Sequence, residues 1–177
     1  MNNKIKKITL ILGTAREGRQ SVKPFNYLAK TLEEMKDVEI TKVDVLDFKL
    51  DFTIAPWVDS VKTKKYRNII KNSDAFIIVS PEYNHSYPGE LKILLDQAME
   101  EYMNKPVLVA GVSSGGFGGV RVVESLMPIL NELGLKYIAY PLYFSKVKDT
   151  FLLKKVEIDN KYKSKVDKSI NELIKNI

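Results

Sequence analysis

The stretch Ala75-Phe76-Ile77-Ile78-Val79-Ser80-Pro81-Glu82-Tyr83-Asn84-His85-Ser86-Tyr87-Pro88-Gly89 decides the fold of this 177-residue chain. Residues 75–79 are apolar and partly β-branched, which predicts a buried strand, and residues 91–102 have the amphipathic pattern of a helix. A strand that leads through a polar, aromatic loop into a helix is the usual ligand corner of an open α/β sheet. Pro88 suits the first helical turn, where an N–H would have no helical partner. The loop offers backbone amides and an aromatic ring more than an acid, a base or a nucleophile, which favours holding a flat cofactor over side-chain chemistry.

Strand and helix patterns alternate along the rest of the chain. The strand-like runs are residues 5–12, 38–43, 75–79, 107–112 and 137–142. The amphipathic segments between them are residues 22–35, 61–71, 91–102 and 120–133. This alternation predicts crossover connections, and hence a parallel sheet with a helical layer on each face. No repeat, linker or low-complexity tract interrupts the pattern, so we expect residues 1–177 to form a single domain.

Five parallel strands leave two common orders open, the Rossmann-like order and the flavodoxin-like order 2-1-3-4-5. In the second order, strands 3 and 4 follow strand 1 across the sheet. The three unusual loops of the chain come after these strands, at residues 13–21, 80–88 and 113–119. Under the order 2-1-3-4-5 they meet at one edge of the sheet, so we expect a three-layer, five-stranded flavodoxin-like fold. Residues 160–176 have helical apolar spacing and predict an additional C-terminal amphipathic helix.

Composition and charge argue against several classes of function. The net charge is +6, but two-thirds of this excess lies in residues 146–177, which contain nine lysines and five acidic residues. A solvated lysine face on the C-terminal helix explains it, so nucleic acid is not an expected partner. The chain has no cysteine and one histidine, His85, which excludes disulfides and thiol chemistry and disfavours a transition-metal site. Redox work would therefore need an organic cofactor.

The apolar runs of the chain are short. None approaches the ~18 residues of a membrane-spanning helix. The run at residues 8–12 is too short for the core of a signal peptide, and it ends at Gly13-Thr14 as a strand would. We therefore expect a cytoplasmic protein with no membrane partner.

The first loop, Gly13-Thr14-Ala15-Arg16-Glu17-Gly18-Arg19-Gln20-Ser21, has the G-x-x-x-x-G spacing of a phosphate loop. Arg19-Gln20 stands where a Walker A loop has Lys-Ser/Thr, and the dinucleotide fingerprint G-x-G-x-x-G is also missing. Two arginines and two hydroxyls in a glycine-framed turn before a helix suit a single terminal phosphate, because amides, helix dipole and guanidinium groups all attract an anion. The alternative is a solvated turn in which Ser21 is an ordinary helix N-cap.

The other two loops also have ordinary alternatives. Tyr83 and Tyr87 could be core or interface aromatics, and Asn84 could be a turn former. His85 is not expected to be a catalytic base, because no carboxylate is evidently placed to orient it and no G-x-S-x-G motif is present. Residues 113–119 hold four of the nine glycines, which indicates either a close approach of the backbone to a ligand or a mobile flap.

Together the three loops resemble those of the NAD(P)H-dependent FMN reductases, a flavodoxin-like family that includes quinone and azo-dye reductases. The resemblance covers about residues 7–142 and rests on three motifs in the family's order. The motifs are Gly13-Thr14-x-Arg16-x-Gly18-Arg19-x-Ser21, Pro81-Glu82-Tyr83-Asn84-His85-Ser86-x-Pro88-Gly89-x-Leu91-Lys92 and Ser113-x-Gly115-Gly116. The chain departs from the family's frequent pattern at Ile93, where an asparagine is common, and at Gln97, where an aromatic residue is common.

The resemblance implies FMN as the cofactor and NADPH or NADH as the electron donor. A small-molecule electron acceptor, such as a quinone, an azo compound or free flavin, would use the same site after the donor has left, which is ping-pong exchange. Similar proteins are homodimers, with the flavin near the interface, so a homodimer or a dimer of dimers is expected. The implied binding residues are Thr14, Arg16, Arg19, Gln20 and Ser21 for the phosphate, Pro81, Glu82, Tyr83 and Asn84 for the ring, and Ser113, Ser114, Gly115 and Gly116 for the ring's other edge. No side chain is assigned a catalytic role and no metal is implied, but Tyr83 and His85 would line the acceptor face.

Two other functions stay open from the sequence. A non-catalytic flavodoxin-like electron carrier would have the same fold and the same flavin, but such carriers are usually acidic, whereas this chain has a pI of about 9.3. A basic protein that binds a phosphorylated metabolite or nucleic acid would be colourless. Trp57 is equally compatible with capping the flavin site of a partner subunit and with a small satellite core.

Overall fold

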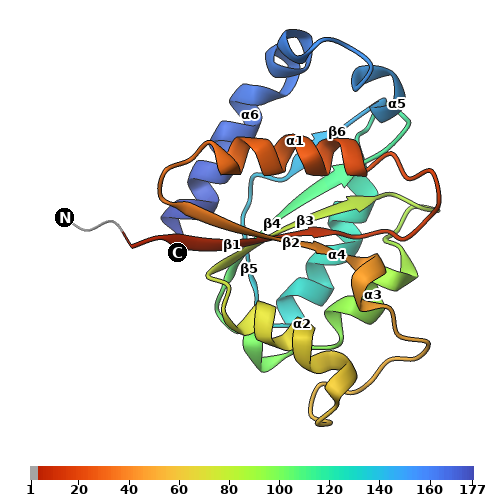
Figure 1. The fold of residues 1–177 in the computed structure, drawn as a ribbon. Helices are drawn as coiled ribbons and strands as arrows, with labels where there is room; N and C mark the ends of the chain where they lie inside the picture. Colours follow the sequence, from red (N-terminus) through yellow and green to blue (C-terminus); the bar gives the residue numbers. More distant parts are fainter. Residues whose placement is uncertain (1–3) are drawn as a thin grey trace.

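A sheet of parallel strands lies between two helical layers in the computed structural model, which describes residues 4–177 (Figure 1). The strands pair in the order β2-β1-β3-β4-β5, with a further short strand, β6, also paired to β4. This order confirms the flavodoxin-like prediction and excludes the Rossmann-like alternative. The strands are β1 (Lys6–Leu12), β2 (Val38–Asp44), β3 (Ala75–Pro81), β4 (Pro106–Val112), β5 (Lys136–Tyr137) and β6 (Leu142–Phe144).

The fifth strand differs from the prediction. Instead of one strand over residues 137–142, the two short strands β5 and β6 pair with successive parts of β4. Lys136 lies opposite Pro106, and Leu142 lies opposite Ala110. The gap between them contains Pro141, which has no N–H for a ladder hydrogen bond. The apolar pattern therefore located this edge of the sheet but did not predict its interruption.

Helices cover both faces of the sheet (Figure 1). α1 and α6 pack on one face, and α2, α3 and α4 pack on the other. The starts of α1, α2 and α4 are those predicted from the sequence, whereas α6 begins at Lys155, earlier than the predicted segment 160–176. The helices are α1 (Val22–Glu33), η1 (Val45–Phe48), α2 (Val61–Lys71), α3 (Gly89–Leu95), η2 (Glu100–Tyr102), α4 (Val120–Glu132), α5 (Val147–Thr150) and α6 (Lys155–Lys175).

The predicted helix at residues 91–102 is two shorter helices, α3 and the 3-10 helix η2. Between them the fully buried Gln97 donates a hydrogen bond from its Nε2 to the carbonyl oxygen of Phe48, at 3.1 Å. Leu94 and Tyr102 nevertheless belong to the same buried cluster. The apolar face runs through both helical pieces, which is why the sequence pattern predicted one continuous helix.

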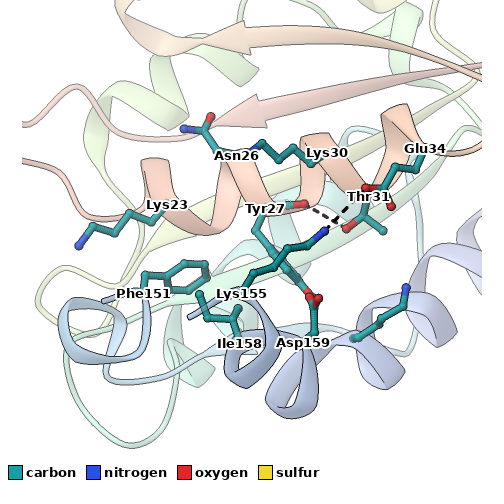
Figure 2. A pocket seen from close by; sticks show the side chains of 11 residues that line it. Lys23, Asn26, Tyr27, Lys30, Thr31, Glu34, Phe151, Lys155, Ile158 and Asp159 are labelled. Carbon is teal, nitrogen blue, oxygen red and sulfur yellow. Dashed lines mark hydrogen bonds and ion pairs between the residues drawn. The ribbon is translucent and has the colours of Figure 1, made fainter. Parts of the chain in front are cut away.

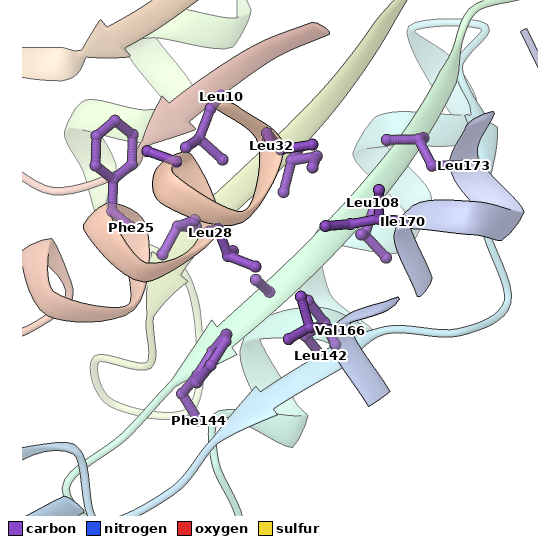
Figure 3. Close-up of a cluster of buried hydrophobic side chains, with 14 of the residues drawn as sticks. Leu10, Phe25, Leu28, Leu32, Leu108, Leu142, Phe144, Val166, Ile170 and Leu173 are labelled. Carbon is purple, nitrogen blue, oxygen red and sulfur yellow. The ribbon is translucent and has the colours of Figure 1, made fainter. Parts of the chain in front are cut away.

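Successive residues of the central strands face opposite sides of the sheet, as the two-residue period of a strand requires. In β3, Ile77 and Val79 join the cluster under α1 and α6, whereas Phe76 and Ile78 join the cluster under α2, α3 and α4. Figure 3 shows the first cluster, in which side chains from α1 and α6 meet across β4. Burial on both faces explains why β3 and β4 are apolar throughout.

The C-terminal helix α6 lies beside α1 and packs on the sheet through its predicted apolar stripe, including Val166, Ile170 and Leu173. Polar contacts also join the two helices, since the Tyr27 hydroxyl donates to Asp159 at 2.8 Å. A cavity of about 320 Å³ lies between them, lined by lysine, acidic and other polar side chains as well as apolar ones, but by no residue of the three loops (Figure 2). The exposed residues of α6 include Lys161, Lys163, Lys165 and Lys168. The basic tail is therefore the solvated face of a packed helix, as expected.

Replacing Ile170 with Ala should lower the free energy of unfolding by roughly 2–5 kcal/mol, because it leaves a cavity between α6 and the sheet. On the same helix, Val156 is 60% exposed, so Val156→Ala should change the free energy of unfolding by no more than about 0.5 kcal/mol. Urea denaturation followed by circular dichroism measures both values. Equal effects of the two substitutions would contradict the packing of α6 described above.

Candidate functional site

The three loops that the sequence singled out lie together at the carboxyl ends of three adjacent strands. Residues 13–21 follow β1, residues 82–88 follow β3, and residues 113–119 follow β4. Backbone hydrogen bonds tie the loops to neighbouring strands, from Gly13 N to Val79 O at 2.8 Å and from Glu82 N to Val112 O at 2.9 Å. The predicted convergence of the loops is confirmed, because the strand order brings their starting points side by side.

The middle loop is built on a tight turn. Tyr83 and Ser86 exchange backbone hydrogen bonds of 2.9 and 3.0 Å, and the two residues between them, Asn84 and His85, have φ angles of 49° and 65°. Two successive positive φ angles are typical of a type I′ turn; this backbone conformation is uncommon outside glycine, although Asn and His adopt it more often than most other residues. Both side chains are exposed. Strain of this kind is characteristic of binding loops, and here it projects Asn84 and His85 into solvent at the edge of the sheet.

Tyr83 connects the middle loop to the first loop. Its hydroxyl lies 3.1 Å from the Oγ1 of Thr14, and the guanidinium of Arg16 lies over its ring, 4.3 Å from the ring centroid. The Thr14 hydroxyl also donates to the Oε1 of Glu90, at 3.1 Å, and the same oxygen accepts the backbone N–H of Ala15 at 2.8 Å. Sequence reasoning missed Glu90, although an acid directly after Pro88-Gly89 in an otherwise recognised motif was a visible signal.

The two arginines of the first loop have different environments. The Arg19 guanidinium forms a two-pronged ion pair with Asp44 at the end of β2, with one N···O distance of 2.7 Å, and it also donates to the carbonyl oxygen of Thr14. Arg16 is exposed, and none of the ion pairs described for residues 4–177 includes it. Arg19 therefore braces the base of the loop, whereas Arg16 is available to a ligand. Asp44 was recognisable in the sequence as an acid at the end of the neighbouring strand.

Ser21 stands at the start of α1 with its side chain buried. Its hydroxyl makes no cap hydrogen bond to the helix, so the interpretation of Ser21 as an ordinary N-cap is wrong. Within the described residues its Oγ has no hydrogen-bond partner. A buried hydroxyl without a partner is unfavourable, and such a group often belongs to a ligand or water site. The neighbouring Gln20 donates its Nε2 to the carbonyl oxygen of Gly18, at 2.8 Å.

The third loop is anchored closely at its base and open at its tip. A Cβ on Gly111 would lie 2.5 Å from the carbonyl oxygen of Gly119, so the turn before α4 packs directly on β4. At the tip, Ser114, Gly115 and Gly116 are exposed, and a Cβ on either glycine would meet no atom within 4 Å. The loop thus leaves bare backbone facing solvent, which allows a flat ligand to approach closely.

Glu82 connects the middle loop to the third. Its carboxylate accepts the backbone N–H of Arg121 at 3.1 Å, and one carboxylate oxygen lies 3.6 Å from the Arg121 guanidinium. The side chain therefore interacts with the N-terminal turn of α4, where a negative charge is favourable. Because the Glu82 N–H is bonded to the carbonyl oxygen of Val112, only the Glu82 carbonyl group is left for the contact with a ring that the sequence resemblance implies.

Most of the predicted binding residues come together at the three loops, and Trp57 lies apart from them. Trp57 is 82% exposed, so its interpretation as part of a satellite core is wrong. Within residues 4–177, no group of three His, Cys, Asp or Glu side chains is placed to hold a metal ion. In the same part of the chain, no helix combines the length and apolar composition needed to cross a bilayer.

Comparison with known proteins identifies relatives of this arrangement. A model of the NADPH-dependent FMN reductase family matches residues 6–149. The chain is 29% identical over 149 residues to an NAD(P)H-dependent FMN reductase of Saccharomyces cerevisiae, covering 75% of this chain and 77% of the relative. It is 31% identical over 138 residues to an NAD(P)H-dependent FMN reductase of Schizosaccharomyces pombe, covering 73% and 68%. It is also 29% identical over 149 residues to a quinone reductase of Pseudomonas putida, and the match covers 78% of this chain and 77% of that relative.

Solved structures share the fold. FerB, a flavoenzyme NAD(P)H:(acceptor) oxidoreductase from Paracoccus denitrificans, gives a TM-score of 0.78 at 23% identity, covering 97% of this chain and 99% of that one. An FMN-dependent NADH-azoreductase from Bacillus anthracis, solved in complex with FMN, gives a TM-score of 0.62 at 15% identity, covering 95% and 100%. The family match spans the sheet and all three loops that it brings together, and the chain therefore belongs to the NADPH-dependent FMN reductase family.

Proposed function

We propose that this chain binds FMN at the three loops and transfers electrons from NADPH or NADH to a small-molecule acceptor. The main support for this function is that a phosphate-type loop, an aromatic loop and a glycine-rich loop meet at one edge of the sheet. Relatives named as FMN, quinone and azo reductases support an acceptor of the quinone, azo-compound or free-flavin class. The chain has no cysteine, so an organic cofactor would have to carry the electrons.

The first loop fits the phosphate of FMN. The Ser21 hydroxyl has no acceptor within the described part of the chain, and it stands at the N-terminus of α1, where the helix dipole attracts anions. The exposed Arg16 supplies a positive charge with no acidic partner among the described ion pairs. Thr14 and Gln20 would join the site by giving up present contacts, because the Thr14 hydroxyl donates to Glu90 and the Gln20 Nε2 donates to the carbonyl oxygen of Gly18. Arg19 would support the phosphate site indirectly, because its ion pair with Asp44 fixes the conformation of the first loop.

The other two loops fit the flavin ring. Asn84 and the backbone carbonyl groups at residues 81–82 would hydrogen-bond the edge of the ring, because the N–H groups of Glu82 and Tyr83 are already bonded within the protein. Ser113 and Ser114, with the bare backbone of Gly115 and Gly116, would close over the other edge. The open space around both glycines leaves room for a planar group. Tyr83 and the exposed His85 would line the face from which the acceptor approaches.

Bound FMN would supply the redox chemistry, accepting a hydride from the nicotinamide and later giving its electrons to the acceptor. The protein's part is to hold the flavin, to leave one face of it open and to place donor groups along its edge. Donor and acceptor would need the same open face, so they would bind in turn, with ping-pong kinetics. No side-chain base is required for this exchange.

The structure also carries an exposed apolar surface suited to a second copy of the chain. Phe52, Trp57, Val58 and Val61 are all exposed on the loop before α2 and on the first residue of α2. A neighbouring cavity of about 380 Å³ is lined by Trp57, Met99 and Leu133 among others. Grouped apolar side chains of this kind are typical of protein interfaces. We infer a homodimer, or a dimer of such dimers, that buries this surface.

The direct test of the function is the visible spectrum of the FMN-reconstituted protein under anaerobic conditions, before and after addition of NADPH and, separately, NADH. A protein-bound flavin band that bleaches much faster than free FMN is expected. A bound flavin that stays oxidised with both donors would instead indicate an electron carrier. Absence of flavin binding would leave the alternative of another phosphorylated ligand.

Arg16→Ala should weaken FMN binding by about ten- to a hundredfold, because it removes a charge-assisted hydrogen bond of roughly 1.5–3 kcal/mol from the phosphate. Riboflavin, which lacks the phosphate, should bind the variant and the native protein almost equally. Lys36→Ala removes an exposed positive charge away from the loops and serves as the matched control. Titrations of flavin fluorescence give the dissociation constants of FMN and riboflavin for the native protein and both variants. An unchanged FMN affinity in Arg16→Ala would refute the phosphate assignment.

Trp57→Ser should raise the fraction of monomer at micromolar concentration, because it removes the largest apolar side chain of the proposed interface. Leu152→Ser is the control, since Leu152 is also exposed but lies between α5 and α6. Size-exclusion chromatography with light scattering gives the mass of each protein. A native chain that is monomeric at this concentration would contradict the dimer.

A further inference from the structure

Glu90 places a carboxylate against the first loop. It belongs to α3, yet its Oε1 accepts hydrogen bonds from the backbone N–H of Ala15, at 2.8 Å, and from the Thr14 hydroxyl, at 3.1 Å. Both donors belong to the loop to which the proposed function assigns the flavin phosphate. The side chain is half-buried, so solvent screens its charge only in part.

No cation neutralises this carboxylate among the ion pairs described for residues 4–177. Arg19 pairs with Asp44, and Arg16 lies over the Tyr83 ring. The negative charge of Glu90 is therefore held by an amide and a hydroxyl, the same kinds of group that hold a phosphate.

We propose that Glu90 competes with the flavin phosphate for the donors of the first loop and so sets how strongly the chain prefers FMN to riboflavin. The inference rests on the proposed function. Its consequence is that the native chain binds FMN less tightly than the same loop would without this carboxylate.

The competition has two physical forms, and both act on the phosphate alone. If Glu90 keeps its hydrogen bonds, its charge lies near the phosphate and repels it, and like charges a few ångströms apart near a protein surface change affinity by about tenfold or more. If Glu90 withdraws, its hydrogen bonds to Ala15 and Thr14 are lost when the phosphate binds. Riboflavin presents no charge to the loop, so neither form weakens its binding.

Glu90→Gln removes the negative charge but keeps the hydrogen bonds, because the amide oxygen of Gln still accepts from the Ala15 N–H and the Thr14 hydroxyl. This variant should bind FMN about tenfold or more tightly than the native chain, and riboflavin within about threefold of it. Flavin fluorescence titrations at low ionic strength, with thermal melting as a check on folding, give both dissociation constants. This gain in FMN affinity should be smaller at high salt, because salt screens the repulsion between the native Glu90 and the phosphate.

Two further variants make the result specific. Glu17→Gln removes an exposed charge from the same loop and should change FMN affinity by less than about threefold, because solvent screens Glu17. Glu90→Ala removes the charge and the acceptor together; it should still raise the ratio of FMN to riboflavin affinity, and it provides the test if Glu90→Gln does not fold.

The outcomes distinguish this inference from the proposed function. Equal FMN affinity in the native chain and both Glu90 variants, equal tightening of FMN and riboflavin, or an equally large effect of Glu17→Gln would overturn the role of Glu90 while leaving FMN binding intact. Failure of every protein to bind either flavin would overturn the proposed function, and the inference with it.

Discussion

The position of β3 between β1 and β4 is the constraint on which the rest of this structure depends. Parallel pairing on both sides of β3 brings three carboxyl ends, and hence three loops, to one edge of the sheet. Alternate residues of β3 are buried under different helical layers, so a slip of one residue would place each side chain under the wrong layer and lose the close packing on both faces. A site assembled from distant segments of the chain is thus held by the core.

Acidic side chains link these loops to one another and to the sheet. Glu82 binds the start of α4 beside the third loop, and Glu90 binds the first loop. Asp44 holds Arg19 from the end of β2. The loops of a basic chain are therefore organised by carboxylates, and of the two arginines of the first loop, Arg16 is the one without an acidic partner in the ion pairs described for residues 4–177. Such local pairing, rather than net charge, governs what the site attracts.

Sequence reasoning was most successful where the signal is local. The strand runs, the helix starts at Val22, Val61 and Val120, and the glycine-framed loops follow from residue type and spacing. It was less successful where two patterns overlap: an apolar face that continues through α3 and η2 looks like one helix, and a strand interrupted at Pro141 looks like one strand. Hydrophobic period reports which face is buried but not whether the backbone hydrogen bonds are continuous.

The sequence by itself determined the alternation of strands and helices, the identity of the three loops and the resemblance to a family of flavin-dependent reductases. Only the tertiary structure decided which loop residues are available to a ligand. Arg16 and Arg19 are alike in sequence, but Asp44 engages Arg19, whereas Arg16 is exposed. Ser21 looks like a cap, but its hydroxyl is buried and has no hydrogen-bond partner among residues 4–177. These differences arise from contacts between residues far apart in the chain, which no local pattern encodes.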